Sequence, residues 1–383
     1  MEPDITEDQE FFAETTRKYL EDKADVTTLR GLRHDPLGYD PAYWRQGCEL
    51  GWTSLLVGED DGGGSISGEG VVDLSLVAFE FGRHAAPGPL LATNAVAMAL
   101  SRAGTPEQKG DVLAGILSGD VVASWAVAEP RPNDRLGAVA MPARRDGEGW
   151  SLEGTKLAVE AGGSAQQFLV SARTDDGLTQ FLVPADAPGL TVRPMESVDL
   201  TRRFAALHFD GVKVAGSAVV GEVGGAADDV ARQLRLVNVL QCAEMVGAMD
   251  KAMEITVDWA FNRYSFGRPL ASYQALKHRF ADMKTWLEAS HGLADGAARA
   301  VQDDAADADE LVSSAKAYIG HYGPELCHEC VQMHGGIGVT FDHDLHLYLR
   351  RVTLDAVLFG TVTDHRLRLA DILEARDETE GAA

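Results

Sequence analysis

Cys327 and Cys330 have the spacing of metal or redox ligands, in the string CHEC. A zinc site needs two such pairs, and the remaining cysteines, Cys48 and Cys242, do not form a second one. A thioredoxin-like redox motif follows a strand, whereas the residues around CHEC have helical periodicity. We therefore predict that both are small buried residues about one turn apart on a helix, and we expect no metal site.

Glu244 is a second candidate, because it is a carboxylate within an apolar string. Its nearest neighbours are Cys242, Ala243, Met245 and Val246. A carboxylate in such surroundings is unusual without a partner or a purpose. Glu244 is thus either a base or pocket residue, or a buried or interface glutamate that is paired with an arginine or a histidine.

Three segments of different periodicity must position these residues. Residues 1–120 place apolar side chains three and four apart, as helices do. Residues 121–222 form short alternating or apolar runs bounded by turn residues, which is typical of an antiparallel sandwich or barrel. The helical period returns in four long stretches over residues 223–383. We predict a mainly α protein with an N-terminal helical domain, a central β domain and a C-terminal four-helix bundle.

Charge and hydropathy exclude several classes of protein. The 383 residues carry a net charge of −25, which argues against non-specific binding to nucleic acid or to an anionic membrane. An anionic small ligand remains possible, because a local basic pocket or a helix N-terminus can hold phosphate. No apolar run approaches the roughly 18–20 residues that span a bilayer, and the acidic start is not a secretion signal. We expect a cytoplasmic protein.

The order of helices, small β domain and four-helix bundle resembles the acyl-CoA dehydrogenase family. Two strings carry the resemblance: NRYSFGRPLASYQ is similar to the family's R-x-x-F-G-[KR] stretch, and QMHGGIG to its Q-x-x-G-G-x-G stretch. The strings LGW at 50–52 and AVAEP at 126–130 also match the family. The resemblance covers essentially the whole chain and implies the fold predicted above.

The resemblance implies that FAD is held between subunits. The positions that match contacts with a neighbouring subunit's FAD are Arg263, Phe266 and Gln274 in the first string and Gln332, Gly335 and Gly336 in the second. Chemistry agrees with this interpretation, because a guanidinium binds diphosphate oxygens in a bidentate manner and a Gly-Gly pair lets backbone amides approach a ligand.

The resemblance also implies a reaction for which this chain lacks the usual acid. In the family, a desolvated glutamate removes the α-proton of an acyl-CoA thioester while flavin takes the β-hydride. Most members carry that glutamate directly before a Gly-Thr pair, where this chain has Phe359 before Gly360 and Thr361. A minority carry it on the long helix before Arg263, where this chain has Val237.

Glu244 is the nearest acid on that helix. It lies two turns, or about 10 Å, beyond Val237.

Thr361 has two predicted roles: it can cap the last helix, or its hydroxyl can reach a bound diphosphate. Asp364 is interpreted as an acid in the first turn of that helix, favoured by the helix dipole.

The β domain departs from the family's pattern as well. Active members show T-E-P followed by Gly-Ser-Asp, and later an aromatic-Ile-[ST] string against the flavin ring. This chain has AEPRPND and KLAVEAGG, so Glu129 and Pro130 remain while the hydroxyl, glycine and aromatic groups do not. The chain keeps the half-site that serves a neighbour's FAD and has lost much of its own.

This division resembles the degenerate subunit of heteromeric actinobacterial acyl-CoA dehydrogenases that act in steroid side-chain breakdown. It implies an α2β2 assembly with a second dehydrogenase subunit, a bulky or polycyclic acyl-CoA as substrate, and electron-transfer flavoprotein as acceptor. One alternative is a self-sufficient homo-oligomeric dehydrogenase that uses Glu244 as its base. Another is a flavin-free acyl-CoA-binding or scaffold protein.

Overall fold

The computed structural model describes residues 5–130 and 138–381. These form two compact units. Of the described residues, the first unit holds 5–28, 75–86 and 238–381, and the second holds 29–74, 87–130 and 138–237.

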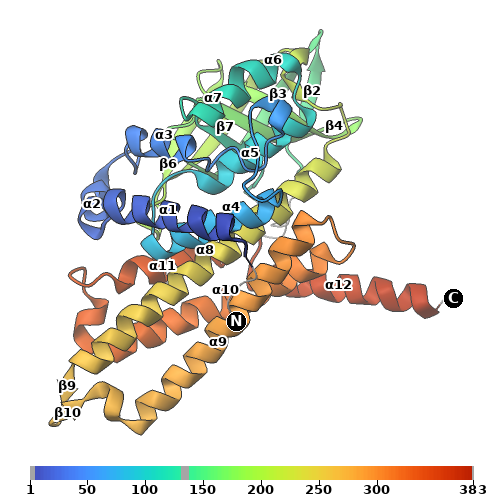
Figure 1. The fold of residues 1–383 in the computed structure, drawn as a ribbon. Helices are drawn as coiled ribbons and strands as arrows, with labels where there is room; N and C mark the ends of the chain where they lie inside the picture. The colour runs from blue at the N-terminus through green and yellow to red at the C-terminus, as the bar shows by residue number, and fades with distance from the viewer. Residues whose placement is uncertain (1–4, 131–137, 382–383) are drawn as a thin grey trace. The chain divides into compact units, whose positions relative to one another are not determined.

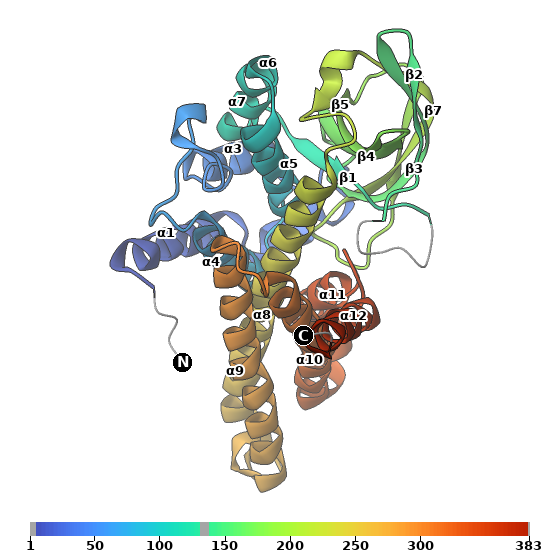
Figure 2. The same cartoon turned by 90° about the vertical axis from the view of Figure 1, so that its right-hand side faces the viewer.

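The first unit is helical (Figure 1). It holds α1 (Glu7–Lys23), most of α4 (Gly70–His84) and of α8 (Ala227–Asn262), α9 (Gln274–Gln302), α10 (Ala308–His334), α11 (Leu345–Asp355) and α12 (Val362–Gly381). Its short elements are β9 (Tyr264–Ser265), β10 (Arg268–Pro269), η5 (Leu270–Ser272) and η6 (Gly335–Val339). Helix α10 packs against α9, α11 and α12, and both views show α9 alongside α8 (Figure 2). This is the helical bundle predicted for the C-terminal segment.

Glycines let α4 and α8 touch along their backbones. A Cβ atom added at Gly82 would lie 1.9 Å from the Glu244 carbonyl oxygen, and one added at Gly247 would lie 2.0 Å from that of Phe79. Both obstacles are backbone atoms, which cannot turn aside as a flexible side chain can. The two helices are therefore closer than any side chain at these positions permits.

We expect Gly247→Ala to lower the free energy of unfolding by about 1–3 kcal/mol, because the new methyl group forces the helices apart. Gly292→Ala in α9 is the matched control, since a Cβ there meets nothing within 4 Å. That substitution should raise stability by roughly 0.5–1 kcal/mol, because alanine is the better helix former. Urea unfolding followed by circular dichroism checks both; equal effects would contradict the close contact.

The second unit combines short helices with two four-stranded sheets. Its helices are α2 (Val26–Gly31, which straddles the unit boundary), η1 (Leu32–His34), α3 (Pro41–Glu49), η2 (Glu59–Asp61), α5 (Leu90–Ala103), α6 (Pro106–Gln108), η3 (Lys109–Leu113), α7 (Ala114–Ser118) and η4 (Gly216–Ala218). Its strands are β1 (Ala123–Ala126), β2 (Ala143–Asp146), β3 (Gly149–Glu160), β4 (Gln167–Thr174), β5 (Gly177–Pro184), β6 (Leu190–Met195), β7 (Phe204–Val214) and β8 (Val219–Val220).

The strand orders are β1-β4-β5-β8 and β2-β3-β7-β6. Figure 2 shows the strands of the two sheets facing one another, and the Trp150 and Phe181 rings, one from each sheet, lie 5.6 Å apart. All pairs are antiparallel except β1 with β4, which is parallel. Between β1 and β4, the chain forms strands β2 and β3 of the other sheet. When it comes back to the first sheet, β4 runs beside β1 in the same direction. The described β domain thus contains parallel pairing that an antiparallel pattern does not include.

Cys327 and Cys330 lie on α10 and are both buried. Burial raises the pKa of the Cys327 thiol well above its ordinary value and that of Cys330 to about 12, so neither is a ready thiolate. The prediction of two buried residues on one helix is confirmed. Within the described residues, no three His, Cys, Asp or Glu side chains gather as metal ligands would. None of the described helices is both long enough and apolar enough to cross a bilayer.

Candidate cofactor site at the end of the helical bundle

The β9–β10 hairpin carries the first predicted cofactor string to one end of α8 and α9 (Figure 1). Helix α8 ends at Asn262, Arg263 follows, and the turn is made by Phe266 and Gly267, with φ of +49° and +81°. Two consecutive positive φ angles are those of a tight type I′ hairpin turn, in which glycine is favoured. Phe266 is 97% exposed at the tip. Its ring is therefore available to another chain or ligand.

A stack of rings joins Arg263 to the second string. The guanidinium carbon of Arg263 lies 5.6 Å from the centre of the Trp259 ring, and that ring is stacked 5.0 Å from His334. His334 ends α10 and is followed directly by Gly335 and Gly336. The structure therefore brings together two strings that lie far apart in the sequence.

The remaining predicted residues of the two strings are also exposed at this end. Gln274 is the first residue of α9, and Gln332 lies in the last turn of α10. A Cβ atom at Gly335 or Gly336 would meet nothing within 4 Å, so open space adjoins the glycine pair. Gly335 also has φ of +65°, which lets α10 end there. A ligand can approach this backbone from outside.

Unsatisfied polar atoms at this end fit a bound FAD. Among the described residues, Arg263 forms no ion pair, although the chain is strongly acidic. Buried Trp259 Nε1 and His334 Nε2 also have no hydrogen-bond partner within the described part of the chain. Such groups normally find a partner, and a ligand or a second chain is one source of it. An exposed guanidinium fits the diphosphate, so the residues present agree with the neighbour-facing half of an FAD site.

The turn at Phe359 and Gly360 is firmly held although it carries no acid. Its φ angles are +53° and +115°. Buried Lys316 donates from Nζ to the carbonyl oxygens of Asp355 (2.6 Å) and Leu358 (2.9 Å), and also to Gln241 Oε1. Lys316, which lies on α10, thereby fixes the end of α11. Sequence reasoning missed this residue, since an isolated lysine in a helical string gives no sign of burial.

Thr361 is engaged in capping α12. Its hydroxyl donates to Asp364 Oδ2 (2.6 Å) and accepts from the Asp364 backbone N–H (3.2 Å), while its own N–H donates to the same carboxylate (2.7 Å). Of the two predicted roles, the geometry supports the cap, and Asp364 is the first-turn acid that was predicted. A contact between Thr361 and the diphosphate stays a prediction without structural support.

Glu244 is a paired, buried carboxylate. It is 2% exposed, and its Oε1 accepts from Nη1 of fully buried Arg351 at 2.5 Å. Nη2 of Arg351 donates to the Ala86 carbonyl oxygen at 2.9 Å, so the ion pair ties α8 and α11 to the end of α4. The geometry favours the paired glutamate of the two sequence interpretations. Val237, the other customary position of the acid, is a fully buried core residue.

His365, on the first turn of α12, makes stability dependent on pH. It is fully buried, and burial and then the charge of Lys316 lower its pKa from 6.5 to about 3. The unfolded chain takes up this proton below pH 6.5 and the folded chain does not, so stability is lost as the pH falls from 6.5 towards 3. At pH 5 the loss from this residue should be about 2 kcal/mol.

Urea unfolding at pH 7 and pH 5 tests this expectation. His365→Gln removes the titrating group, so its stability should fall less between the two pH values than that of the parent chain. His278→Gln changes an exposed histidine and should keep the parental difference. Identical pH dependence in all three proteins would contradict a neutral buried His365.

The β domain replaces the expected flavin-facing string with a buried ion pair. Glu160 Oε1 accepts from Arg202 Nε at 2.6 Å, and both side chains are buried. Ala158 and Ala161, on either side of Glu160, have φ of +48° and +52°. This string offers neither an aromatic ring nor a free hydroxyl, so it does not fit the flavin-facing half of an FAD site.

Glu129 is retained for a structural reason. Its carboxylate accepts from the buried Lys156 ammonium at 2.8 Å and from the backbone N–H groups of Ala140 and Met141. Burial lowers the pKa of Lys156 to about 8, opposed by the charge of Glu129. Of the string AEPRPND, residues 131–134 lie outside the described residues.

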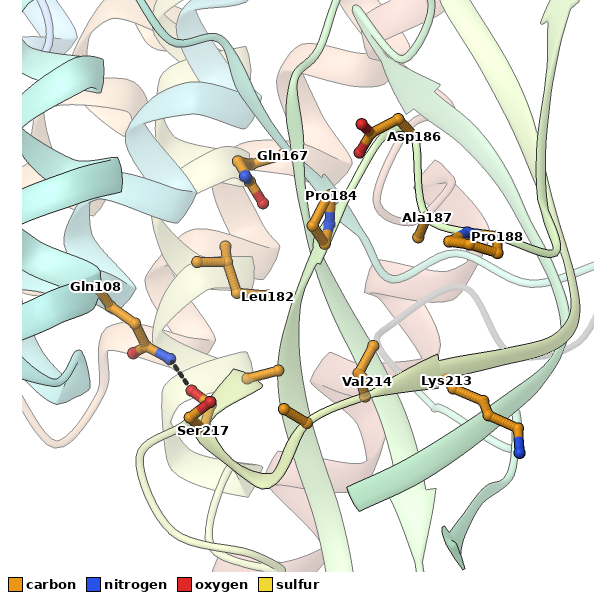
Figure 3. A pocket seen from close by; sticks show the side chains of 12 residues that line it. Gln108, Gln167, Leu182, Pro184, Asp186, Ala187, Pro188, Lys213, Val214 and Ser217 are labelled. Carbon is orange, nitrogen blue, oxygen red and sulfur yellow. Dashed lines mark hydrogen bonds between the residues drawn. The ribbon is translucent and has the colours of Figure 1, made fainter. Parts of the chain in front are cut away.

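A separate cavity of about 660 Å³ is lined by residues of the β domain and by Gln108 of α6 (Figure 3). The Gln108 amide donates across one side of it to the Ser217 carbonyl oxygen at 3.0 Å. Its lysine, Lys213, is paired with Asp146. None of the residues predicted from the sequence lines this cavity in the described structure.

Comparisons with known proteins agree with the fold. Models of the acyl-CoA dehydrogenase N-terminal, middle and C-terminal domains match residues 6–120, 124–212 and 229–373. Acyl-CoA dehydrogenase FadE27 of Mycobacterium tuberculosis is 30% identical over 86% of this chain and 87% of its own length.

Two solved structures are similar over almost their whole length. A variant of the Tcur3481-Tcur3483 steroid ACAD superposes with a TM-score of 0.87 at 30% identity, covering 98% of this chain and 99% of the other. The ChsE4-ChsE5 complex from Mycobacterium tuberculosis gives a TM-score of 0.87 at 28% identity, with the same coverage of 98% and 99%.

Proposed function

Because this chain belongs to the acyl-CoA dehydrogenase family, whose members use FAD, we propose that it is one subunit of a heteromeric acyl-CoA dehydrogenase. In this assembly it supplies half of an FAD site to a partner subunit of the same family. The observation that carries the proposal is the contrast between its two half-sites. At the hairpin end of the bundle Arg263 is exposed and forms no ion pair with a described residue, whereas the string at Glu160 is closed by Arg202.

The division of work between subunits follows from that contrast. FAD, when bound, accepts the β-hydride of the acyl-CoA. In this chain Arg263 would bind the diphosphate, and the backbone at Gly335 and Gly336 would let the ligand approach closely. The α-proton would be removed by the partner, since Phe359 and Val237 occupy the customary positions of the acid and Glu244 is paired with Arg351.

Exposed apolar side chains support a partner at the same end. Phe261 and Tyr264 are each 65% exposed beside the fully projecting Phe266. Rings of this size gain free energy when another surface covers them, and aromatic residues are enriched in protein interfaces. We propose that the second subunit covers this patch while bringing its FAD to Arg263, and that the assembly is α2β2.

We propose a bulky, steroid-like acyl-CoA as the substrate class. Support for the substrate class comes from the similar structure that is described as a steroid ACAD. The other similar structure, a complex of ChsE4 with ChsE5, supports an assembly of two different chains. Electron-transfer flavoprotein is the proposed acceptor and the cytoplasm the proposed location. We likewise propose domain boundaries near residues 120 and 222.

The visible spectrum of the purified protein tests the proposed function. The chain should be purified alone and after co-expression with candidate partner subunits of the acyl-CoA dehydrogenase family. Alone it should lack stoichiometric flavin absorbance, and the co-purified complex should be yellow and reduce an electron acceptor with acyl-CoA. Stoichiometric flavin and activity in the isolated chain would refute the proposal and favour the self-sufficient enzyme. A colourless, inactive complex would favour the flavin-free scaffold.

A further inference from the structure

Resting on the proposed function, we propose that Arg268 is a second anion-binding residue, and that Arg263 and Arg268 together form a preformed site for a nucleoside diphosphate. This pair is called the hairpin arginines below. The proposal starts from the way in which each guanidinium is supported. Arg263 lies over Trp259, and the Arg268 guanidinium carbon lies 3.9 Å from the centre of the Tyr273 ring.

Support by a ring leaves a guanidinium ready to bind. A guanidinium that lies over an aromatic face uses its flat side for the ring, while its N–H donors point outward in its own plane. Because part of the side-chain freedom is already lost, less entropy is lost when a phosphate binds. Neither hairpin arginine forms an ion pair with any described residue, although acids outnumber bases strongly in this chain.

The register of the hairpin places both arginines on one face. Arg268 pairs with Ser265, and the Leu270 N–H donates to the Arg263 carbonyl oxygen at 2.9 Å. Leu270 therefore lies opposite Arg263, and Arg268, two residues before Leu270, points to the same side. Diagonal neighbours of this kind are about 7–8 Å apart at the backbone. Two long side chains from such positions can bind the two phosphates of one diphosphate.

The supporting rings are themselves fixed. The Tyr273 hydroxyl donates to the Ser265 carbonyl oxygen at 2.8 Å, which ties the ring to the hairpin. Trp259 is held by its stack on His334, and Nδ1 of His334 is 2.8 Å from the Cys330 carbonyl oxygen within α10. We assign Tyr273 and Trp259 as positioning residues, which act on the ligand through the arginines.

Isothermal titration calorimetry of ADP binding to the isolated chain tests the proposal. ADP carries the diphosphate without the flavin ring, so its binding does not depend on contacts between the β domain and that ring. The parent chain should bind one ADP molecule, and its affinity should fall as the salt concentration rises. Arg268→Ala should weaken binding roughly 10-fold, as expected when a charge-assisted hydrogen bond is lost. Arg268→Lys should recover only part of this, because the planar fork is missing.

Three further variants separate binding from folding. Tyr273→Leu removes the ring but no charge, and it should weaken ADP several-fold, whereas Tyr273→Phe keeps the ring and should bind nearly as the parent does. Arg279→Ala removes a charge of α9 that is already paired with Glu329, so ADP affinity should stay unchanged. Circular dichroism confirms that each variant is folded.

The proposal is overturned if the parent chain binds no ADP, if folded Arg268→Ala binds as the parent does, or if Arg279→Ala loses as much affinity. These outcomes are distinct from failure of the proposed function. A co-purified complex that is yellow and active although Arg268→Ala changes nothing leaves the heteromeric enzyme intact and removes only Arg268. Conversely, an isolated chain that holds stoichiometric FAD refutes the heteromeric enzyme even where the ADP series behaves as expected.

Discussion

Glu244→Gln should lower the free energy of unfolding by about 3–5 kcal/mol, because it removes a negative charge that accepts directly from the fully buried Arg351 guanidinium. The effect is large because both side chains are buried, where water cannot solvate a charge whose partner has been neutralised. Urea or thermal unfolding of the purified chain measures it. A residue that served only as a catalytic base would give the opposite pattern, with normal stability and no turnover.

Two controls separate the buried pair from general damage. Replacing both partners, as Glu244→Leu with Arg351→Met, should recover much of the lost stability, since no uncompensated charge remains. Arg144→Ala breaks the exposed pair of Arg144 with Glu153 and should leave the unfolding midpoint almost unchanged. If Glu244→Gln unfolds at the parental midpoint, the ion pair contributes nothing and the base interpretation regains its force.

The partner of Glu244 shows where sequence reasoning ends. The apolar neighbours of Glu244 indicated either a base or pocket residue, or a glutamate paired with an arginine or a histidine. Identifying Arg351 required the fold, because the two residues are 107 positions apart and meet only when α11 crosses α8. Local patterns predict what kind of partner a residue needs, and tertiary packing decides which residue supplies it.

The sequence indicated the contacts of Thr361 but not those of Lys316. The Thr-x-x-Asp pattern of Thr361 and Asp364 is itself a capping signal, and the structure shows that cap in full. Lys316 gave no such signal, since lysine in a helix is normally solvated. Only the meeting of α10 with the end of α11 makes it a buried donor to two backbone carbonyl groups.

The helical bundle and the β domain were predictable because hydrophobic periodicity is a local property of the sequence. The succession of the segments follows directly from their order in the sequence. The parallel pairing of β1 with β4 was not, since it depends on the path through the second sheet. The meeting of Arg263 with His334 through Trp259 is likewise non-local. Motif spacing indicated both strings, but the stack that joins them is visible only in three dimensions.

Arg263→Ala, introduced into the co-expressed complex, should raise the dissociation constant of FAD roughly 100-fold. A bidentate guanidinium forms two charge-assisted hydrogen bonds to a diphosphate, and alanine replaces neither. The side chain is exposed and has no ion pair among the described residues, so its removal should not disturb the fold of this chain. Flavin retained after gel filtration, and titration of the flavin-free complex with FAD, measure the change.

Thr361→Val is the informative contrast, because both residues were predicted from the sequence to contact the cofactor. The Thr361 hydroxyl is already bonded to Asp364, so its loss should weaken the cap of α12 by about 1 kcal/mol and leave FAD affinity unchanged. Equal loss of flavin in both variants would mean that Thr361 leaves its cap to reach the ligand. Loss in Arg263→Ala alone would place the diphosphate at the hairpin end of the bundle, where two ring-supported arginine side chains are exposed.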